Sequence, residues 1–339
     1  MRQISFYILR RLLYLIPQVF VVSLITFVVV RLLPANPAFK LAGPAASAEN
    51  IHQIEIRLGL NKPIFTQFWI YLNDLVHGNL GNSFVSGREV LSDIGDFLPP
   101  TLELLILGLF FAFLIGVPLG VLSALGGGKG IASRFSIGYG LLAGAIPDFW
   151  LGLILIYVFY SKTGLAPPPL GQIDTNVVYE KVTGAAAFDT LVTGNWNGFG
   201  SALGHLVLPL VTIVFVYMAP IVKFTRSSIE EIYYGTEFID QYRANGLSNR
   251  AVIFRALRNG LPPVITIVGV LFGFLLGGLV LIESVFAWGG LGQYAVSSIQ
   301  NSDFSAVQGF VIVAAIFNLA VYLIVDLLYF AVDPRLRAR

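Results

Sequence analysis

The sequence contains no cysteine, few histidines and little charge. Without cysteine the chain forms neither a disulfide nor a thiolate metal site. His52, His77 and His205 are scattered, and their spacing does not indicate a metal-ligand set. Charged residues make up only 12% of the 339 residues, and the net charge is +2. The chain therefore has no general polyanion-binding character, and nucleic acid is not expected as a partner.

Apolar residues are abundant instead. They make up 56% of the chain, and the mean hydropathy is +0.79, which is too apolar for a soluble domain. The period-two alternation of a membrane β-barrel is absent. A helix needs about 20 residues to cross the hydrocarbon core. Six apolar runs of about this length, the third interrupted by Asp148, predict an all-α integral membrane protein with six transmembrane helices: 12–30, 104–128, 135–161, 206–222, 259–282 and 304–325.

The distribution of positive charge predicts the orientation of these helices. Most of the 21 Lys and Arg residues lie on the side that holds the N-terminus, so we expect both termini in the cytoplasm. Arg10 and Arg11 resemble the start of a signal peptide, but the apolar run that follows is long for one, and we expect an uncleaved helix. Three parts are predicted: a first transmembrane helix (1–33), an extracytoplasmic segment (34–100) and a core of five transmembrane helices (101–339).

Two segments are expected outside the membrane on the extracytoplasmic side. Within 34–100, the stretches 47–60 and 66–76 are polar but compatible with helices. The core carries an extracytoplasmic insertion at 162–204, and its Gly- and Asn-rich end, "TGNWNGFGSALG" (193–204), is expected to be irregular.

The cytoplasmic loop at 223–263 is the most basic part of the chain. Apolar residues recur every three to four positions on both sides of Gly246, which predicts two short helices. Gly246 is placed as a helix C-cap and Ser248 as the N-cap of the next helix. Pro262 and Pro263 are expected to end that helix or to start the fifth span. Two interpretations of the positive charge stay open: contact with lipid headgroups, or docking of a partner protein.

Several motifs carry a family resemblance that covers nearly the whole chain. The loop "YRANGLSNR…LRNGLPPVI" resembles the EAA motif of ABC importer permeases, and the wider match is to the B-type subunit of the dipeptide/oligopeptide permease family. The chain departs from the family at Gln241, Tyr242 and Asn245, where Thr, Ala and Lys are usual, and at Ala35 and Asn36, where Gly and Asp are usual. Further motifs follow in order: "LGLNKP" (58–63), "GNLGNS" (78–83), "LPPTLEL" (98–104), "AIPDFWLGLILI" (145–156), "ESVFAWGGLGQ" (283–293) and "VDLLYFAVDPR" (325–335).

The resemblance implies a type I importer permease in the bacterial inner membrane, with no chemistry of its own. Its expected partners are a second homologous permease subunit, two ATPase subunits, an extracytoplasmic substrate-binding protein and membrane lipid. No cofactor is expected in this chain, because ATP and Mg²⁺ would be bound by the ATPase subunits. Peptides are the expected substrate, with nickel chelates, glutathione, opines and oligosaccharides as alternatives within the family. The residues expected to couple to the ATPase are Glu237, Asp240, Tyr242, Arg243, Ala244, Asn245, Gly246, Leu247 and Arg250.

Three acidic residues within or near spans are further candidates. A carboxylate at the centre of a span costs about 2.5–3.5 kcal/mol on insertion scales, so Asp148 should face a cavity or a partner. Three interpretations of Pro147 and Asp148 stay open: they line the pathway and attract a substrate ammonium, they form a structural hydrogen bond at a proline kink, or the span is shifted so that Asp148 lies near a membrane interface. Glu283 and Asp326 lie at span ends, where charge costs little, and structural roles are expected for them.

Other classes of protein fit less well. "LGGGKGIAS" (125–133) fails the ATP-binding pattern G-x-x-x-x-G-K-[ST], because Ser123 replaces its first Gly and Gly130 replaces its Ser or Thr. A secondary transporter would carry coupling charges in several spans, yet only Asp148 qualifies. A membrane enzyme would need a nucleophile with a base, or a metal set, and the histidines supply neither.

Overall fold

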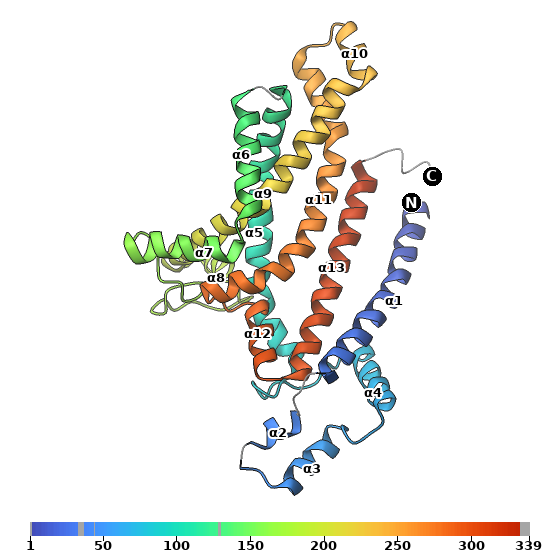
Figure 1. Ribbon diagram of the computed structural model, residues 1–339, viewed down its shortest axis with the longest axis vertical. Coiled ribbons are helices and arrows are strands. Elements are labelled where there is room, and N and C mark those ends of the chain that lie inside the picture. Colours follow the sequence, from blue (N-terminus) through green and yellow to red (C-terminus); the bar gives the residue numbers. More distant parts are fainter. Residues whose placement is uncertain (1, 33–36, 44, 128–129, 333–339) are drawn as a thin grey trace. The chain divides into compact units, whose positions relative to one another are not determined.

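The structure is a computed structural model that describes residues 2–32, 37–43, 45–127 and 130–332. These residues are almost entirely helical (Figure 1), apart from turns, loops and one isolated β-bridge between Asn82 and Glu89. They form two compact units. The first holds residues up to Pro100 together with Gly289–Leu319, and the second holds Thr101–Trp288 together with residues from Ala320 onward.

Five helices in the described residues are long and apolar enough to cross a membrane, and a bent helix pair makes a sixth if it is one span. All six coincide with predicted spans. Most extend beyond the apolar runs, since a helix can continue past the hydrocarbon core with charged residues on it. The five are α1 (Arg2–Leu32), α5 (Val90–Leu125), α9 (Trp196–Gly235), α11 (Asn249–Phe286) and α13 (Phe304–Val332).

The third predicted span is not a single straight helix, which corrects the expectation for 135–161. It consists of α6 (Ile131–Ala145) and α7 (Asp148–Leu155), which continues into a π-helix, η1 (Ile156–Lys162). The two parts meet at 96°, so α7 runs crosswise to α6 (Figure 1). Pro147 explains the bend, because a proline disfavours helical geometry in the residue before it, and Ile146 is extended.

The fifth span corrects a second expectation. Pro262 and Pro263 neither end nor start a helix, because α11 runs through both from Asn249. A membrane helix tolerates proline when neighbouring groups satisfy the disturbed backbone. Next to these prolines, Ser228 of α9 donates a hydrogen bond to the Gly260 carbonyl at 2.9 Å. The start of α11 at Asn249 and its apolar part are therefore one continuous helix.

The first unit contains the predicted helical stretches of the outer segment. They form α3 (Ala48–Arg57) and α4 (Ile64–Val76), preceded by the short α2 (Pro37–Ala42), and α12 (Leu291–Gln300) lies in the same unit. The aromatic rings of Phe27, Phe68 and Tyr71 pack α1 against α4, with Phe27 5.2 Å from Phe68 between centroids. The sequence predictions for α3 and α4 are confirmed.

Asp303 organises the polar interior of the first unit. Its carboxylate is fully buried and accepts hydrogen bonds from Ser83 Oγ at 2.6 Å and from the amides of Phe84 and Val85 at 2.7 and 3.1 Å. Its other oxygen accepts from the Ala306 amide at 3.2 Å, which caps the start of α13. A buried carboxylate is tolerated because donors surround it. Asp303 thus ties the loop at 83–85 to α13.

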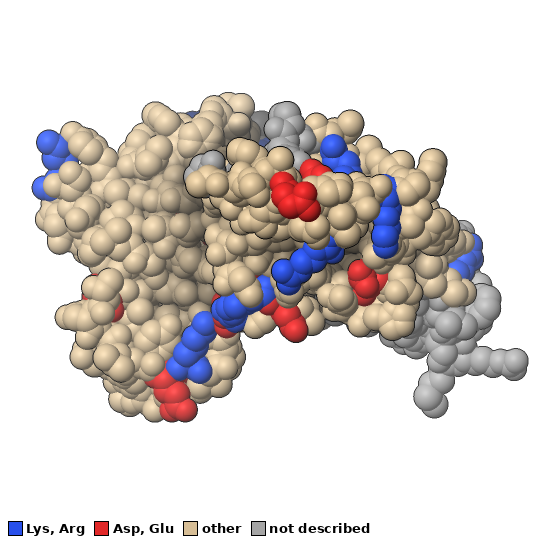
Figure 2. All heavy atoms as spheres, turned by 90° about the horizontal axis from the view of Figure 1, so that it is seen from below, with Lys and Arg blue, Asp and Glu red and all other residues tan. Residues whose placement is uncertain are grey.

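The face drawn in Figure 2 carries few charges. Acidic and basic side chains are interspersed there, and wide areas between them are uncharged. On this face the structure offers no large patch of one sign, in keeping with the low net charge of the sequence.

The insertion of the second unit is more ordered than expected. It contains α8 (Ala186–Val192), and α9 begins at Trp196, so most of the stretch predicted to be irregular is helical. Asn195 caps α9 by accepting a hydrogen bond from the Gly198 amide at 2.9 Å. The buried Asp189 carboxylate accepts hydrogen bonds from the amides of Val182, Thr183 and Gly184. Gly198, Gly200 and Gly204 lie within α9, whereas Gly194 lies in the turn before it with a φ of +70°.

The helix α9 is the centre of the second unit. It packs most extensively against α11 and also contacts α6, α7 and α8. Small residues recur every fourth position on α5, at Gly108, Ala112, Gly116 and Gly120, and this spacing lets two helix backbones approach closely. A Cβ atom added at these glycines would lie 2.5 Å from Ile213, 3.0 Å from Met218 and 2.6 Å from Thr225, all on α9. The small-residue face of α5 therefore fixes α9 in place.

We expect Gly120→Ala to destabilise the protein by about 1–3 kcal/mol, the usual cost of overpacking. The new Cβ would meet the Thr225 side chain and also the Val222 carbonyl at 2.9 Å, and a backbone atom cannot move aside easily. The measurement is the midpoint of thermal unfolding of the purified protein in detergent. Gly138→Ala is the matched control, because that helical glycine has open space around it. Equal midpoints for the two variants would contradict close α5–α9 packing.

Candidate functional site

The loop that connects α9 to α11 is the first candidate site; we call residues 236–248 the α9–α11 loop. At Thr236 the backbone becomes extended and α9 ends, and α10 (Glu237–Ala244) follows. Gly246 has a φ of +73°, in the left-handed region that favours glycine. The Ser248 side chain accepts a hydrogen bond from the Ala251 amide at 3.4 Å and caps α11. The glycine turn and the serine cap expected from the sequence are confirmed.

A small hydrophobic core holds α10 against the start of α11. Ile239, Val252 and Ala256 are each at most 1% exposed. Partly buried side chains from α10, from the turn after it and from the end of α9 surround them: Ile232, Tyr233, Phe238, Tyr242 and Leu247. The α9–α11 loop is therefore a packed element attached to two long helices.

Several residues expected on the docking surface have internal roles. The Arg243 guanidinium lies 4.6 Å from the centroid of the Tyr233 ring and forms an ion pair with Asp240 at 2.9 Å. The Tyr242 ring lies under Arg255, 4.5 Å from its guanidinium, and the Tyr242 hydroxyl accepts a hydrogen bond from Arg255 at 3.3 Å. Tyr242, one of the departures from the family pattern, thus joins α10 to α11.

The remaining predicted residues point outward. Glu237, Ala244, Asn245 and Arg250 are exposed, and in the part of the chain that the structure describes neither Glu237 nor Arg250 has an ion-pair partner. Together with Gly246 they form the exposed surface of the loop. The charge pattern of the sequence could not separate Arg250 from Arg243, because both belong to one basic cluster.

A cavity of about 890 Å³ is the second candidate site. Its walls come from α6, from the start of α7 and from the sides of α9 and α11. Most lining residues are small or apolar, such as Gly140, Gly144 and Leu271. The charged lining residues are Asp148, Lys223, Arg226 and Glu230. A cavity of this size holds a small-molecule ligand.

Pro147 and Asp148 both line this cavity. Asp148 is the first residue of α7, where the helix dipole favours a negative charge. Its Oδ1 accepts a hydrogen bond from the Phe149 amide at 2.7 Å. Asp148 thus lies at a proline bend and also faces a cavity, and its role in a pathway stays a prediction.

Glu283 and Asp326 have different outcomes. Glu283 is fully buried although it lies near the end of α11, and it accepts a hydrogen bond from the Thr101 hydroxyl of α5. Glu283 thus lies near a helix end, as expected, but in a buried position, and its structural role stays a prediction. The position is buried because α5 packs over it, which the sequence of α11 alone does not reveal. The side chain of Asp326 lies outside the described residues.

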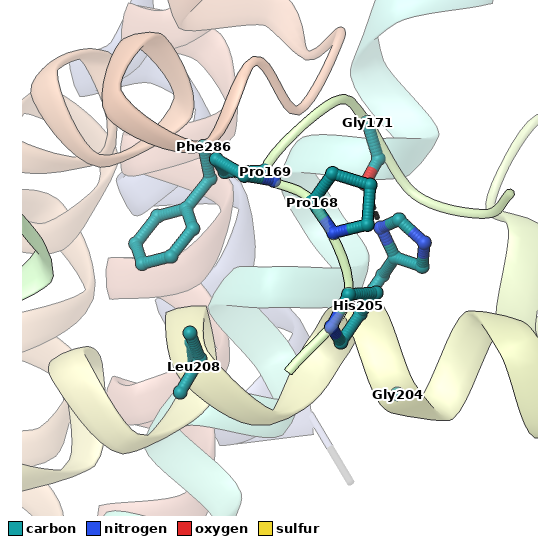
Figure 3. Close-up of a pocket in the computed structure, with 8 residues that line it drawn as sticks. Pro168, Pro169, Gly171, Gly204, His205, Leu208 and Phe286 are labelled. Atoms are coloured by element: carbon teal, nitrogen blue, oxygen red, sulfur yellow. Dashed lines mark hydrogen bonds between the residues drawn. The ribbon is translucent and has the colours of Figure 1, made fainter. Parts of the chain in front are cut away.

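A third pocket, shown in Figure 3, has a structural explanation. It measures about 10 Å³, roughly the space of one water molecule. His205 of α9 lies beside it, with Nδ1 2.9 Å from the Gly171 carbonyl and Nε2 3.2 Å from the Asp174 carboxylate. Hydrogen bonds from Ser201 and His205 lower the pKa of Asp174. These contacts fasten the insertion to α9, and no group of metal-binding side chains occurs among the described residues.

Comparison with known proteins identifies the family. Residues 116–338 match the family described as binding-protein-dependent transport system inner membrane component, and residues 4–105 match the N-terminal family of the same membrane components. The chain belongs to this family. It is thus a multi-pass membrane permease subunit, as the sequence resemblance implied.

Curated relatives match over nearly the full length. The chain is 41% identical to the probable D,D-dipeptide transport system permease protein DdpB of Escherichia coli K12, over 93% of this chain and 92% of the relative. It is 35% identical to the dipeptide permease DppB of Alkalihalophilus pseudofirmus, over 98% and 99%. It is 33% identical to the glutathione permease GsiC of Escherichia coli O6:H1, over 98% of both chains. The departures at Tyr242 and Asn245 therefore occur within a chain that aligns with permeases from end to end.

We expect Ile239→Ala to loosen the α9–α11 loop. Removing a fully buried aliphatic side chain lowers the free energy of unfolding by about 2–5 kcal/mol. The core beneath α10 has only two other fully buried side chains, Val252 and Ala256, so the lost contacts are not replaced. The measurement is the rate of limited proteolysis within 236–248 in the detergent-solubilised protein. Phe254→Ala is the control, because Phe254 lies at the start of α11 and its side chain is 68% exposed. Equally slow cleavage of both variants and the parent would show that this core does not hold α10.

Proposed function

We propose that this permease forms half of the translocation pathway of an ATP-driven importer of di- and oligopeptides in the bacterial inner membrane. The other half would come from a second, homologous permease subunit. An extracytoplasmic binding protein would deliver the substrate, and two ATPase subunits would bind ATP and Mg²⁺ on the cytoplasmic side. The names of the relatives support peptides as substrate, and GsiC keeps glutathione, itself a small peptide, among the alternatives.

The continuity of α9 and α11 carries the proposal. Each helix runs without interruption between the α9–α11 loop and the wall of the 890 Å³ cavity. At about 1.5 Å per residue, the 40 residues of α9 extend roughly 60 Å, twice the hydrocarbon thickness. A displacement of the loop therefore reaches the cavity through two rods.

The two rods are also joined to each other near the loop. Gly260 of α11 lies so close to α9 that a Cβ there would come within 2.5 Å of Ile229, and Ser228 hydrogen-bonds its carbonyl. With α10 packed on α11, closure of the ATPase subunits against the loop would move α9 and α11 together. The cavity would then change its opening by a rigid-body movement. This chain supplies binding and movement, and the ATPase subunits supply the energy.

Transport by the complete complex tests this function. The chain is co-purified with its sister permease and ATPase subunits, reconstituted into proteoliposomes and supplied with its binding protein. We expect uptake of labelled dipeptide that requires ATP on the ATPase side and stops when the ATPase catalytic glutamate is changed. Uptake that persists without ATP, or that follows an ion gradient, would indicate a secondary transporter instead.

A charge reversal at Arg250 tests the docking surface. A charge-assisted hydrogen bond contributes about 1.5–3 kcal/mol, so we expect Arg250→Glu to weaken ATPase binding about tenfold or more. The dissociation constant of the isolated ATPase subunit for the permease pair in nanodiscs is the measurement. Arg134→Glu makes the same charge change at an exposed residue next to another cytoplasmic turn, outside the loop. Contact with lipid headgroups alone would leave ATPase affinity unchanged in Arg250→Glu, or weaken it equally in both variants.

A further inference from the structure

The charged residues of the large cavity differ in whether they are paired. Arg226 and Glu230 lie one turn apart on α9, and Arg226 Nε is 3.3 Å from Glu230 Oε2, so these two charges compensate each other. Asp148 accepts only the amide of its own neighbour, Phe149, through Oδ1. Lys223 is exposed on the cavity wall and has no acidic partner among the described residues. One free carboxylate oxygen and one free ammonium therefore remain.

The free carboxylate oxygen has a defined position. A Cβ atom added to Gly278 of α11 would lie 3.5 Å from Asp148 Oδ2 and 2.6 Å from the Tyr217 hydroxyl. Only a glycine at this point of α11 leaves room for the Tyr217 hydroxyl, and Asp148 Oδ2 lies at ordinary contact distance from the same point. Tyr217 also lines the cavity and belongs to α9, as Lys223 does. The polar end of the cavity therefore joins three elements: α7, α9 and α11.

The length of the cavity wall along α9 suits a short peptide. Tyr217 and Lys223 both line the cavity and are six positions apart on α9, which corresponds to about 9 Å along the helix axis. An extended chain covers about 3.3–3.6 Å per residue, so two to three residues span roughly 7–11 Å. The intervening wall is mostly apolar, with Ala219, Pro220 and Val222, and it leaves room for peptide side chains.

We propose that this cavity accepts the transported peptide as a zwitterion, with Asp148 facing its terminal ammonium and Lys223 facing its terminal carboxylate. Tyr217 and Gly278 lie next to the Asp148 carboxylate. This inference rests on the proposed function. It goes further by naming the residues of this chain that contact the substrate and by requiring both free termini.

The competing explanation for Lys223 is the general excess of positive charge on the cytoplasmic side of membrane proteins. That explanation requires no free acid near the far end of the same cavity. It also predicts that removing the charge of Lys223 affects topology or assembly and leaves the amount of peptide moved per ATP unchanged. The two explanations therefore differ in a measurable quantity.

The experiment measures peptide uptake and ATP hydrolysis together. It uses the complete importer in proteoliposomes with binding protein and labelled alanyl-alanine. We expect Asp148→Asn and Lys223→Gln each to lower the peptide moved per ATP by about tenfold, as expected for one lost charge-assisted hydrogen bond. Asp148→Glu and Lys223→Arg keep the charges and should retain most of the uptake. ATP hydrolysis stimulated by the binding protein should change little, because these residues lie away from the α9–α11 loop.

Two surface variants are the matched controls. Glu49→Gln and Lys62→Gln each remove one negative or one positive charge at an exposed position of the first unit. They should leave the amount of peptide moved per ATP unchanged. Assembly is checked by size-exclusion chromatography. If Asp148→Asn fails to assemble because its helix start is disturbed, Lys223→Gln decides, since its side chain is exposed and unpaired. A normal ratio in the neutral variants that assemble would overturn this inference.

The outcomes also separate this inference from the proposed function. If the unaltered complex takes up no peptide with ATP, the proposed function itself fails. If it transports normally and the neutral variants do too, only the role of the cavity charges is wrong. An equal loss in the neutral and charge-preserving variants would point to packing at these positions and would likewise overturn the proposal.

Discussion

The close approach of helix backbones to α9 is the constraint on which the second unit depends. Lipid tails are as apolar as the helices themselves, so the hydrophobic effect alone does not drive helices together in a membrane. Small residues replace that driving force by allowing dense packing. Gly108, Gly116 and Gly120 of α5 accommodate α9 side chains, and Gly260 of α11 accommodates Ile229. Held on both sides, α9 can move only together with its neighbours, which is what mechanical coupling requires.

Polar groups in the two units show which charges serve structure and which remain available. Asp303 in the first unit, and Asp189 and Glu283 in the second, are fully buried and accept hydrogen bonds from nearby donors. Burial of a carboxylate is costly unless such donors are present, so these residues fix loops and helix ends. Asp148 and Lys223 follow the opposite rule: both face a large cavity, and in the described residues neither has a side chain of opposite charge. The proposed binding role of Asp148 and Lys223 rests on this contrast.

The sequence predicted the spans and the turn at Gly246 well, because apolar runs and capping residues act locally. It failed where distant contacts decide. Pro262 and Pro263 suggested a helix boundary, yet α9 supports an unbroken α11 there. The glycines of 194–204 suggested a loop, yet most of this stretch belongs to α9, which packs against α8. Pro147 drew attention to Asp148, but the 96° bend and the cavity beside it cannot be predicted without the three-dimensional structure. The burial of Glu283 was not predicted, because its partner Thr101 is remote in sequence.

The basic cluster of the α9–α11 loop shows why charge counting overestimates a docking surface. Arg243 stacks on Tyr233 and Arg255 stacks on Tyr242, so part of the positive charge holds α10 to the end of α9 and to α11. A loop that transmits force must be stiff, and cation–π contacts over a small hydrophobic core provide stiffness without a long buried interface. The residues left outward, including Arg250, are free to contact a partner because the others maintain the shape of the loop. Stiffness and recognition are thus divided between neighbouring residues of one motif, which is why a single substitution in this cluster need not affect both.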